Sequence, residues 1–291
     1  MQTQATDQDL LRHMGWETAP LLGAGGEARV YDLGDGRVAR VIRDGAQRDQ
    51  VLARAELLRE IAAGAETLPF QTPEVLDIIE RDGRLAMLER RLDGSPLSLA
   101  LASATHSRRE NLLASYLETA LQLQDIAVPR HWFGPLIGDR ALRADSWQVF
   151  LQVRLLRSSQ TCPADLREAV LDPSGRALPD VATPRLVHLD YFADNVLVAD
   201  GAVSAVLDFS VTSLAGDPRL DAWSAVAYLD PEITPSATDD DRRFAHDWLA
   251  AAGLETDYPA ARRWLAAYWS HAADDLTLMG WCRRILMTDR S

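Results

Sequence analysis

The segment HLDYFADN at 188–195 constrains this chain more than any other part of its sequence. It places a histidine, a carboxylate and an amide in the pattern H-x-D-x-x-x-x-N. A second carboxylate, Asp208, follows thirteen residues after Asn195, in the triplet DFS. Between them, Asp200-Gly201 is typical of a tight turn joining two strands. We therefore expect a β-hairpin that brings Asn195 and Asp208 side by side.

These residue types match the chemistry of phosphoryl transfer. One carboxylate accepts or orients the proton of an attacking hydroxyl, while a second carboxylate and an amide oxygen hold magnesium on the phosphates. Taken alone, 188–195 is equally typical of a polar turn between strands. Asp208 at its spacing, together with GDPRLD at 216–221, favours the catalytic interpretation.

The block 188–221 resembles the catalytic loop and metal-binding triplet of the kinase-like superfamily. More narrowly, it is similar to the aminoglycoside phosphotransferase family of small-molecule kinases, whose pattern continues with Gly-Asp-Pro and a later aspartate, as 216–221 does here. Weaker similarity extends over about residues 20–285. It includes LAMLERRLDGSPL at 85–97, which resembles the family's hinge strand, and GPLIG at 134–138.

The resemblance implies a role for each matching residue. Asp190 would be the catalytic base or hydroxyl-orienting group, and Asn195 and Asp208 would bind Mg²⁺. Structural support without substrate contact is implied for His188, Asp217 and Asp221. Leu189 stands where many members carry glycine and protein kinases carry arginine, and this departure removes no catalytic group.

A glycine-rich stretch at 23–28 lies between two predicted strands. Gly23, Gly25 and Gly26 would let the backbone approach nucleotide phosphates and present N–H groups to them. A glycine-rich hairpin turn is the alternative interpretation. The position ahead of an N-terminal strand pair favours a nucleotide-covering loop.

The chain contains no lysine, and all 30 of its basic residues are arginine. Kinase-like enzymes hold the α- and β-phosphates with a cation on the next strand, so in this chain either an arginine does this or no residue does. Arg40 is similar in position to the arginine of many aminoglycoside phosphotransferase relatives, and arginine binds phosphate well. The predicted helix 46–63 should supply its carboxylate partner. We favour Glu56 over Glu60, and a solvent-facing side chain is the alternative for either.

The resemblance also implies where adenine would bind. It would lie on the hinge backbone at 88–91, a segment that includes Glu89 and Arg91. Met87 would flank it, although core packing is the simpler interpretation of that residue. ATP and GTP both remain open as the nucleotide, with Mg²⁺ as the metal.

The pattern of elements predicts an α+β fold of the bilobal protein-kinase-like type. Residues 1–91 would form a small β-rich nucleotide-binding lobe, in which Asp35-Gly36 and Asp82-Gly83 mark hairpin turns. Residues 92–291 would form a larger, mainly helical catalytic and substrate-binding lobe. Its clearest helical patterns are 108–126 and 143–157, and the part after about 217 is mainly helical.

Composition excludes several classes of function. The chain has 291 residues and a net charge of −13, which disfavours nucleic acid as a main partner. We find no apolar run near 18 residues and no basic-then-apolar leader, so no membrane partner is expected. Cys162 and Cys282 form neither a disulfide framework nor a zinc ligand set. A cytoplasmic location is expected, and the oligomeric state stays open.

The acceptor is predicted to be a small molecule. Only seven residues separate Asp208 from Gly216, and no A-P-E segment follows to seat a peptide. Acidic side chains in the C-terminal part would suit a cationic substrate such as an aminoglycoside antibiotic. Asp274 and Asp275 are the favoured candidates, whereas the acidic run at 239–241 is better explained as a solvated helix start.

Two alternatives stay open beside an aminoglycoside kinase. One is a metabolic kinase for a sugar, an amino alcohol or an amino acid on the same fold. The other is a catalytically silent nucleotide-binding module that regulates by binding. The chain retains Asp190, Asn195 and Asp208. This argues against a silent module, because a protein without catalysis has no need of all three residues.

Overall fold

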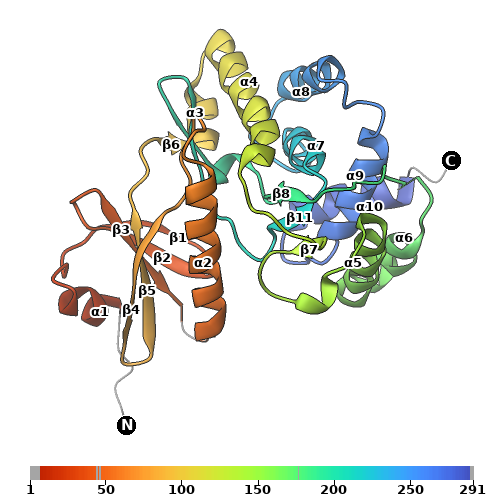
Figure 1. Ribbon diagram of the computed structural model, residues 1–291. Helices are drawn as coiled ribbons and strands as arrows, with labels where there is room; N and C mark the ends of the chain where they lie inside the picture. The colour runs from red at the N-terminus through yellow and green to blue at the C-terminus, as the bar shows by residue number, and fades with distance from the viewer. Residues whose placement is uncertain (1–6, 44, 46, 176, 289–291) are drawn as a thin grey trace. The chain divides into compact units, whose positions relative to one another are not determined.

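The computed structural model describes residues 7–43, 45, 47–175 and 177–288 (Figure 1). The chain divides into two compact units, Met1–Asp93 and Gly94–Ser291, here named the N-terminal unit and the C-terminal unit. The sequence predicted this boundary between residues 91 and 92. The first unit is built on a β-sheet and the second is mainly helical.

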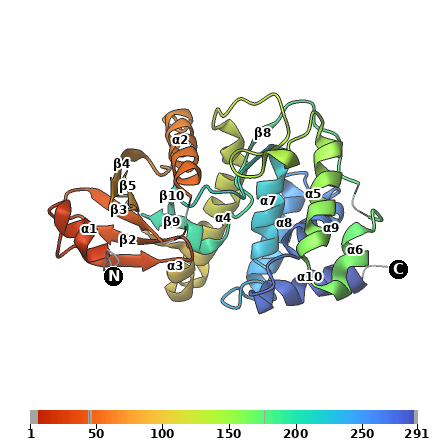
Figure 2. The same ribbon diagram turned by 90° about the horizontal axis from the view of Figure 1, so that it is seen from below.

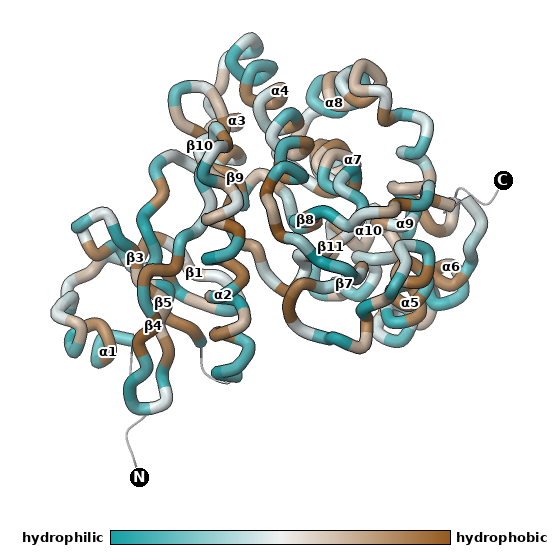
Figure 3. The backbone as a smooth tube through the Cα atoms, in the orientation of Figure 1, coloured by the Kyte–Doolittle hydropathy of each residue, from teal (hydrophilic) through white to brown (hydrophobic). Residues whose placement is uncertain are grey.

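The N-terminal unit contains a five-stranded antiparallel sheet in the order β1-β2-β3-β5-β4. The strands are β1 (Leu21–Ala24), β2 (Ala28–Asp32), β3 (Arg37–Ile42), β4 (Val75–Arg81) and β5 (Arg84–Arg90), and helix α2 (Arg48–Gly64) follows β3. The turn between β4 and β5 uses left-handed backbone at Asp82 and Gly83, as a two-residue hairpin requires. In Figure 3 this turn is coloured as hydrophilic, whereas parts of β4 and β5 are coloured as hydrophobic.

Helix α1 (Asp7–His13) was not predicted, because seven residues give little periodic signal. Leu10 and Leu11 pack against alternate residues of β3 and β5, namely Ala39, Val41, Ala86 and Leu88. The Asp7 carboxylate is 7% exposed; it accepts from Arg29 Nη1 at 2.6 Å and from Tyr31 Oη at 2.9 Å, and it pairs with Arg84. Because side chains alternate along a strand, Arg40 lies on the sheet face opposite α1.

The C-terminal unit contains eight described α-helices and two small sheets. The helices are α3 (Leu97–Ser103), α4 (His106–Gln122), α5 (Trp147–Thr161), α6 (Arg167–Leu171), α7 (Arg219–Tyr228), α8 (Asp239–Ala251), α9 (Tyr258–Trp269) and α10 (Leu276–Thr288). The strands are β6 (Ser95–Pro96), β7 (Gly134–Pro135), β8 (Arg185–Val187), β9 (Val196–Ala199), β10 (Ala202–Val206) and β11 (Leu214–Gly216). They pair as β10-β9-β6 and β7-β11-β8. None of the described helices is long and apolar enough to cross a membrane.

A cluster of aromatic rings forms the core beneath the β7-β11-β8 sheet. The rings of Trp147 and Phe150 on α5 lie 5.3 Å apart, and both lie within 6.4 Å of Trp264 on α9. Gly216 in β11 faces this cluster, and a Cβ built there would lie 2.9 Å from Trp147 Cζ3. The glycine of the GDP segment therefore permits close packing of β11 on Trp147.

We predict that Gly216→Ala lowers the free energy of unfolding by about 1–3 kcal/mol, because the added methyl must displace a buried indole. Chemical denaturation measures this loss. Gly280→Ala is the matched control, since Gly280 is an exposed position of α10 where a Cβ would meet nothing within 4 Å. That control should leave stability unchanged or raise it by up to about 1 kcal/mol. Equal stability of the two variants would contradict the packing argument.

Candidate active site

A short hairpin joins the residues that the sequence singled out. Strands β9 and β10 pair from Ala199↔Ala202 to Val196↔Val206, with left-handed backbone at Asp200 and Gly201 in the turn. At the open end, Leu207 N–H donates to the Asn195 carbonyl at 2.7 Å. Asp208, the next residue, is half-buried. The expected hairpin is present, and it brings the backbones of Asn195 and Asp208 to one end.

A hydrogen bond from Asn195 joins Asp190 to the open end of the β9–β10 hairpin. The Asn195 side chain is buried, and its Nδ2 donates to the Asp190 carbonyl at 2.9 Å. Because a carbonyl only accepts, this bond fixes the amide orientation and leaves Oδ1 as the atom able to bind a cation. The Asp190 side chain is half-buried.

A buried carboxylate on α7 holds the loop that carries Asp190. Asp221 Oδ2 accepts from His188 N at 2.8 Å, and its Oδ1 accepts from Leu189 N at 2.7 Å. Ser224, one turn along α7, donates to the Leu189 carbonyl at 3.0 Å. Burial raises the pKa of Asp221 to about 7, against the two N–H bonds, which lower it. Helix α7 thus fixes three backbone groups directly before Asp190.

Leu189 adopts a left-handed backbone conformation with φ of 67°. For an L-residue this costs about 1–2 kcal/mol. The Leu189 side chain is fully buried, and burial of a leucine contributes about 1.5–3 kcal/mol. Glycine would adopt this φ without strain, which explains its frequency here in similar sequences. In this chain, burial offsets the strain.

His188 and a tyrosine pair complete the support of the loop. His188 Nε2 donates to the Leu207 carbonyl at 2.7 Å, which links the loop to the residue before Asp208. Tyr116 on α4 donates to the Tyr191 carbonyl at 2.6 Å, and Tyr191 donates back to the Tyr116 carbonyl at 3.0 Å. Their rings stack 4.8 Å apart. Sequence reasoning missed this reciprocal pair, because only the fold brings two residues 75 positions apart together.

Asp217 forms an ion pair with Arg219, the first residue of α7. It is 1% exposed, and Arg219 Nε and Nη2 approach its two oxygens at 3.0 and 2.7 Å. Arg219 Nη1 also donates to Asp257 at 3.1 Å. The carboxylate is therefore engaged within the protein.

The glycine-rich stretch forms the β1–β2 hairpin of the N-terminal unit. Gly25 N–H donates to the Ala28 carbonyl at 2.9 Å, and Cβ atoms built on Gly23, Gly25 and Gly26 would meet nothing within 4 Å. Two arginines hold the hairpin from neighbouring elements. Arg43 Nε donates to the Gly25 carbonyl at 2.8 Å, and Arg54 Nη1 of α2 donates to Glu27 at 2.6 Å.

Arg40 pairs with a carboxylate that the sequence assigned to another role. Its Nε donates to Glu89 Oε1 on β5 at 2.9 Å, and Glu89 is 3% exposed. Glu56, the favoured partner, is exposed on α2, and Glu60 is half-buried. The sheet order brings Arg40 and Glu89 together, because β3 lies directly beside β5.

Two backbone N–H groups of the hinge segment form hydrogen bonds within the N-terminal unit. The N–H groups of Arg90 and Arg91 donate to the carbonyls of Glu74 at 3.0 Å and Gly36 at 2.9 Å. The Arg91 side chain pairs with Asp32. These two N–H groups are therefore not available to adenine. Met87 is fully buried, which agrees with its interpretation as core.

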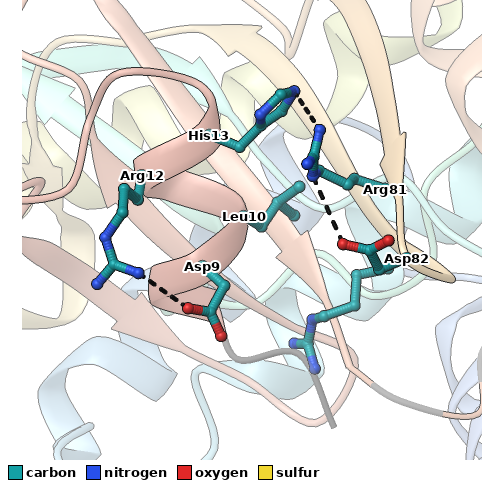
Figure 4. A pocket seen from close by; sticks show the side chains of 7 residues that line it. Asp9, Leu10, Arg12, His13, Arg81 and Asp82 are labelled. Carbon is teal, nitrogen blue, oxygen red and sulfur yellow. Dashed lines mark hydrogen bonds and ion pairs between the residues drawn. The ribbon is translucent and has the colours of Figure 1, made fainter. Parts of the chain in front are cut away.

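A pocket in the N-terminal unit lies between α1 and the β4–β5 turn (Figure 4). Arg84 on its lining pairs with Asp7, and the other charged side chains contact one another. Arg12 contacts Asp9 at 3.0 Å, and Arg81 contacts Asp82 at 3.5 Å and His13 at 2.8 Å. The pocket contains none of the residues predicted for catalysis or nucleotide binding.

The donor chemistry of Asn195 and Asp208 fits Mg²⁺, which prefers oxygen ligands. Among the described residues, no group of three or more His, Cys, Asp or Glu is placed to hold a metal ion. An amide and one carboxylate form an open ligand set of the kind that Mg²⁺ completes with water and phosphate oxygens.

Asp274 and Asp275 are exposed and directly precede α10. Asp275 Oδ1 accepts from Leu278 N at 2.9 Å, which is the bond of a helix N-cap. The acidic run at 239–241 begins α8, where Thr238 and Asp241 form a capping box. A capping role accounts for Asp275 and for Asp241 without a ligand.

Comparison with known families decides the classification: residues 18–268 match the phosphotransferase enzyme family. The chain belongs to this family. The resemblance seen in the sequence and the predicted enzyme class, a phosphotransferase, are thereby confirmed. No curated protein matches the sequence.

Solved structures of other phosphotransferases are similar to the chain. Aminoglycoside phosphotransferase APH(2'')-Ib with bound ADP has a TM-score of 0.59 and 16% identity, with 97% of this chain and 98% of that chain covered. APH(2'')-IIa, from a ternary complex with streptomycin and ATP, has a TM-score of 0.57 and 17% identity, with 99% and 97% covered. Macrolide 2'-phosphotransferase MphH of Brachybacterium faecium has a TM-score of 0.53 and 19% identity, with 97% and 99% covered. These similarities confirm the predicted kinase-like α+β fold.

We predict that Asp221→Asn destabilises this phosphotransferase by about 1–3 kcal/mol, because the new amide group faces a buried backbone N–H. Asp82→Asn, at the exposed β4–β5 turn, is the matched control and should be neutral. The pH dependence has a defined sign. A folded pKa of about 7 exceeds the unfolded value near 3.9, so the Asp221 contribution is present below about pH 4 and is lost as the pH rises to about 7.

Urea denaturation between pH 5 and pH 8 tests both parts. The stability difference between the wild type and Asp221→Asn should shrink as the pH rises. A difference that grows with pH would show that the two N–H bonds outweigh burial.

Proposed function

We propose that this phosphotransferase transfers the γ-phosphoryl group of ATP to a hydroxyl of a small-molecule acceptor, with Asp190 as the group that orients the hydroxyl and accepts its proton. The observation that carries the proposal is the linked set in the C-terminal unit. Two hydrogen bonds, Asn195 Nδ2 to the Asp190 carbonyl and Leu207 N to the Asn195 carbonyl, link the predicted catalytic residue Asp190 to Asn195 and to the residue directly before Asp208.

The proposed reaction is an in-line transfer. The acceptor oxygen attacks the γ-phosphorus while the bond from phosphorus to the bridging oxygen of ADP breaks, and the hydroxyl proton passes to Asp190. Asn195 Oδ1 and the Asp208 carboxylate would hold Mg²⁺, which neutralises phosphate charge when bound. Asp221 and His188 position the loop through its backbone and touch no reacting atom.

The N-terminal unit would bind the nucleotide phosphates. The open space around Gly23, Gly25 and Gly26 suits a close approach of phosphate oxygens to the backbone. The Arg40 guanidinium, oriented by Glu89, would supply the positive charge. ADP in one similar structure and ATP in another support an adenine nucleotide, and GTP stays the alternative.

The segment after Asp208 supports a small acceptor over a peptide. The chain turns at Ser210, whose carbonyl accepts from Ser213 N at 3.0 Å, and it enters β11 at Leu214. An activation segment has no room there. Because APH(2'')-IIa forms a ternary complex with streptomycin and ATP, aminoglycosides are the first acceptors to assay, with sugars, amino alcohols and amino acids as alternatives.

We predict that Asp190→Asn lowers kcat about 10²- to 10⁴-fold while ATP binding is retained, because only proton acceptance by the carboxylate is lost. The measurement is ADP release and phosphate incorporation over an acceptor panel, with ATP affinity by calorimetry. Asp200→Asn is the matched control; this exposed turn aspartate has φ of 52°, which asparagine tolerates. Full activity of Asp190→Asn would overturn the assigned role.

A second prediction separates metal binding from proton acceptance. Asp208→Asn should weaken binding of ATP in the presence of Mg²⁺ by at least about tenfold and leave metal-free ATP binding unchanged. Asparagine keeps the left-handed backbone of Asp208, whose φ is 61°, and removes only the charge. Calorimetric titrations with and without Mg²⁺ measure the two affinities. Equal losses under both conditions would contradict a role through the metal.

ATP binding without transfer to any acceptor, and without slow hydrolysis that depends on Asp190, would favour the silent regulatory module. This outcome is distinct from failure to bind ATP, which would count against the nucleotide site as well.

A further inference from the structure

An arginine and a cluster of aromatic rings lie together in the C-terminal unit, outside the catalytic loop. The Arg154 guanidinium of α5 lies over the Tyr268 ring of α9, 4.1 Å from its centroid. Helices α5 and α9 lie side by side in both views (Figure 1 and Figure 2). Ser158, one turn along α5, donates to the Tyr268 carbonyl at 3.3 Å, which fixes the two helices locally.

Arg154 has no counter-ion among the described residues. Its Nη2 lies 3.5 Å from His271 Nδ1, and the guanidinium also hydrogen-bonds to the neutral Tyr268 side chain, which carries no counter-charge. That nitrogen lies 2.8 Å from the Tyr268 carbonyl, which can only accept, so Nδ1 carries its proton and cannot accept from Arg154. Arg154 Nε is buried and has no hydrogen-bond acceptor in the described part of the chain.

The surroundings leave the positive charge of Arg154 uncompensated. Burial lowers the pKa of His271, the hydrogen bond to the Tyr268 carbonyl opposes this, and Arg154 adds to the lowering, so this histidine supplies no negative charge to Arg154. The Trp269 ring stacks on His271, 5.9 Å apart, and its Nε1 is a second buried donor without an acceptor among the described residues. A half-buried guanidinium whose Nε–H has no acceptor among the described residues, together with the indole N–H of Trp269, suits an anionic group.

The cluster is continuous with the loop that carries Asp190. The Phe192 ring, two residues after Asp190, lies 6.0 Å from the Tyr228 ring at the end of α7. Helix α7, which ends at Tyr228, is in contact with helix α9, which carries Tyr268. Burial raises the pKa of the Tyr268 phenol. The positive charge of Arg154 opposes this rise, and the negative charge of Asp190 adds to it.

We infer that Arg154 binds a carboxylate of the acceptor whose hydroxyl Asp190 orients, so that the substrate class is a hydroxy acid. The inference rests on the proposed function. It replaces the expectation of a polycationic acceptor, because the charge facing the cluster is positive and Asp275 is engaged in capping α10. The buried Tyr268 ring beside Arg154 keeps water from one face of the guanidinium and so strengthens its attraction for a carboxylate.

Melting temperature in the presence of ADP and Mg²⁺ tests the inference without requiring turnover. The probes are aliphatic hydroxy acids of about three to seven carbons, each paired with its carboxamide, and kanamycin as a polycation. The variants are Arg154→Gln and Arg154→Lys. The control is Arg157→Gln, an exposed position on the same helix that pairs with Asp139 at 3.5 Å.

We expect at least one hydroxy acid to raise the melting temperature of the wild type and of Arg157→Gln, while its carboxamide and kanamycin do not. Arg154→Gln should weaken the apparent affinity about tenfold or more, and Arg154→Lys should weaken it less, because lysine keeps the charge but not the two-pronged geometry. If Arg154→Gln does not fold, Arg154→Lys still reports the effect.

Stabilisation by kanamycin, equal effects of acid and carboxamide, unchanged affinity in both Arg154 variants, or no response to any hydroxy acid would overturn the inference. The proposed function is tested separately by Asp190-dependent ATP turnover. If ATP turnover depends on Asp190 but hydroxy acids do not bind through Arg154, only the role of Arg154 is contradicted. If a hydroxy acid binds through Arg154 but no phosphoryl transfer occurs, only the catalytic role of Asp190 is contradicted.

Discussion

The contact between Asp221 and the backbone of His188 and Leu189 is the constraint on which the catalytic loop depends. Two N–H groups converge on one buried carboxylate, with bonds of 2.8 and 2.7 Å. This geometry holds Leu189 at a positive φ and so sets the direction in which the chain leaves toward Asp190. Buried N–H groups without acceptors would each cost about 1–3 kcal/mol, so the strained conformation and the carboxylate require each other.

Arginine performs the cationic roles throughout this lysine-free chain. Arg40 is held by Glu89, Arg54 and Arg43 hold the glycine-rich hairpin, and Arg84 binds Asp7 beneath the sheet. The planar guanidinium suits these positions because it presents several fixed donors to carboxylate and carbonyl oxygens at once. The absence of a counter-ion at Arg154 among the described residues, by contrast, marks it as a candidate for binding an anionic group.

The fold explains why capping aspartates resembled a cationic substrate site in the sequence. Carboxylates are favourable at helix N-termini whether or not they bind a ligand. Asp275 and Asp241 cap α10 and α8 through backbone N–H groups. These two carboxylates thus have a structural role as helix caps.

The sequence by itself determined the features that depend on local order: the hairpin from Asn195 to Asp208, the tight turns, the longer helices and the family. Spacing along the chain fixes these through backbone geometry and periodicity. Tertiary structure alone decided which distant groups meet. It gave Arg40 the neighbouring-strand residue Glu89, paired Tyr116 with Tyr191, and placed Arg154 over Tyr268. Such contacts depend on sheet order and helix packing, which bring together residues that no periodic pattern connects.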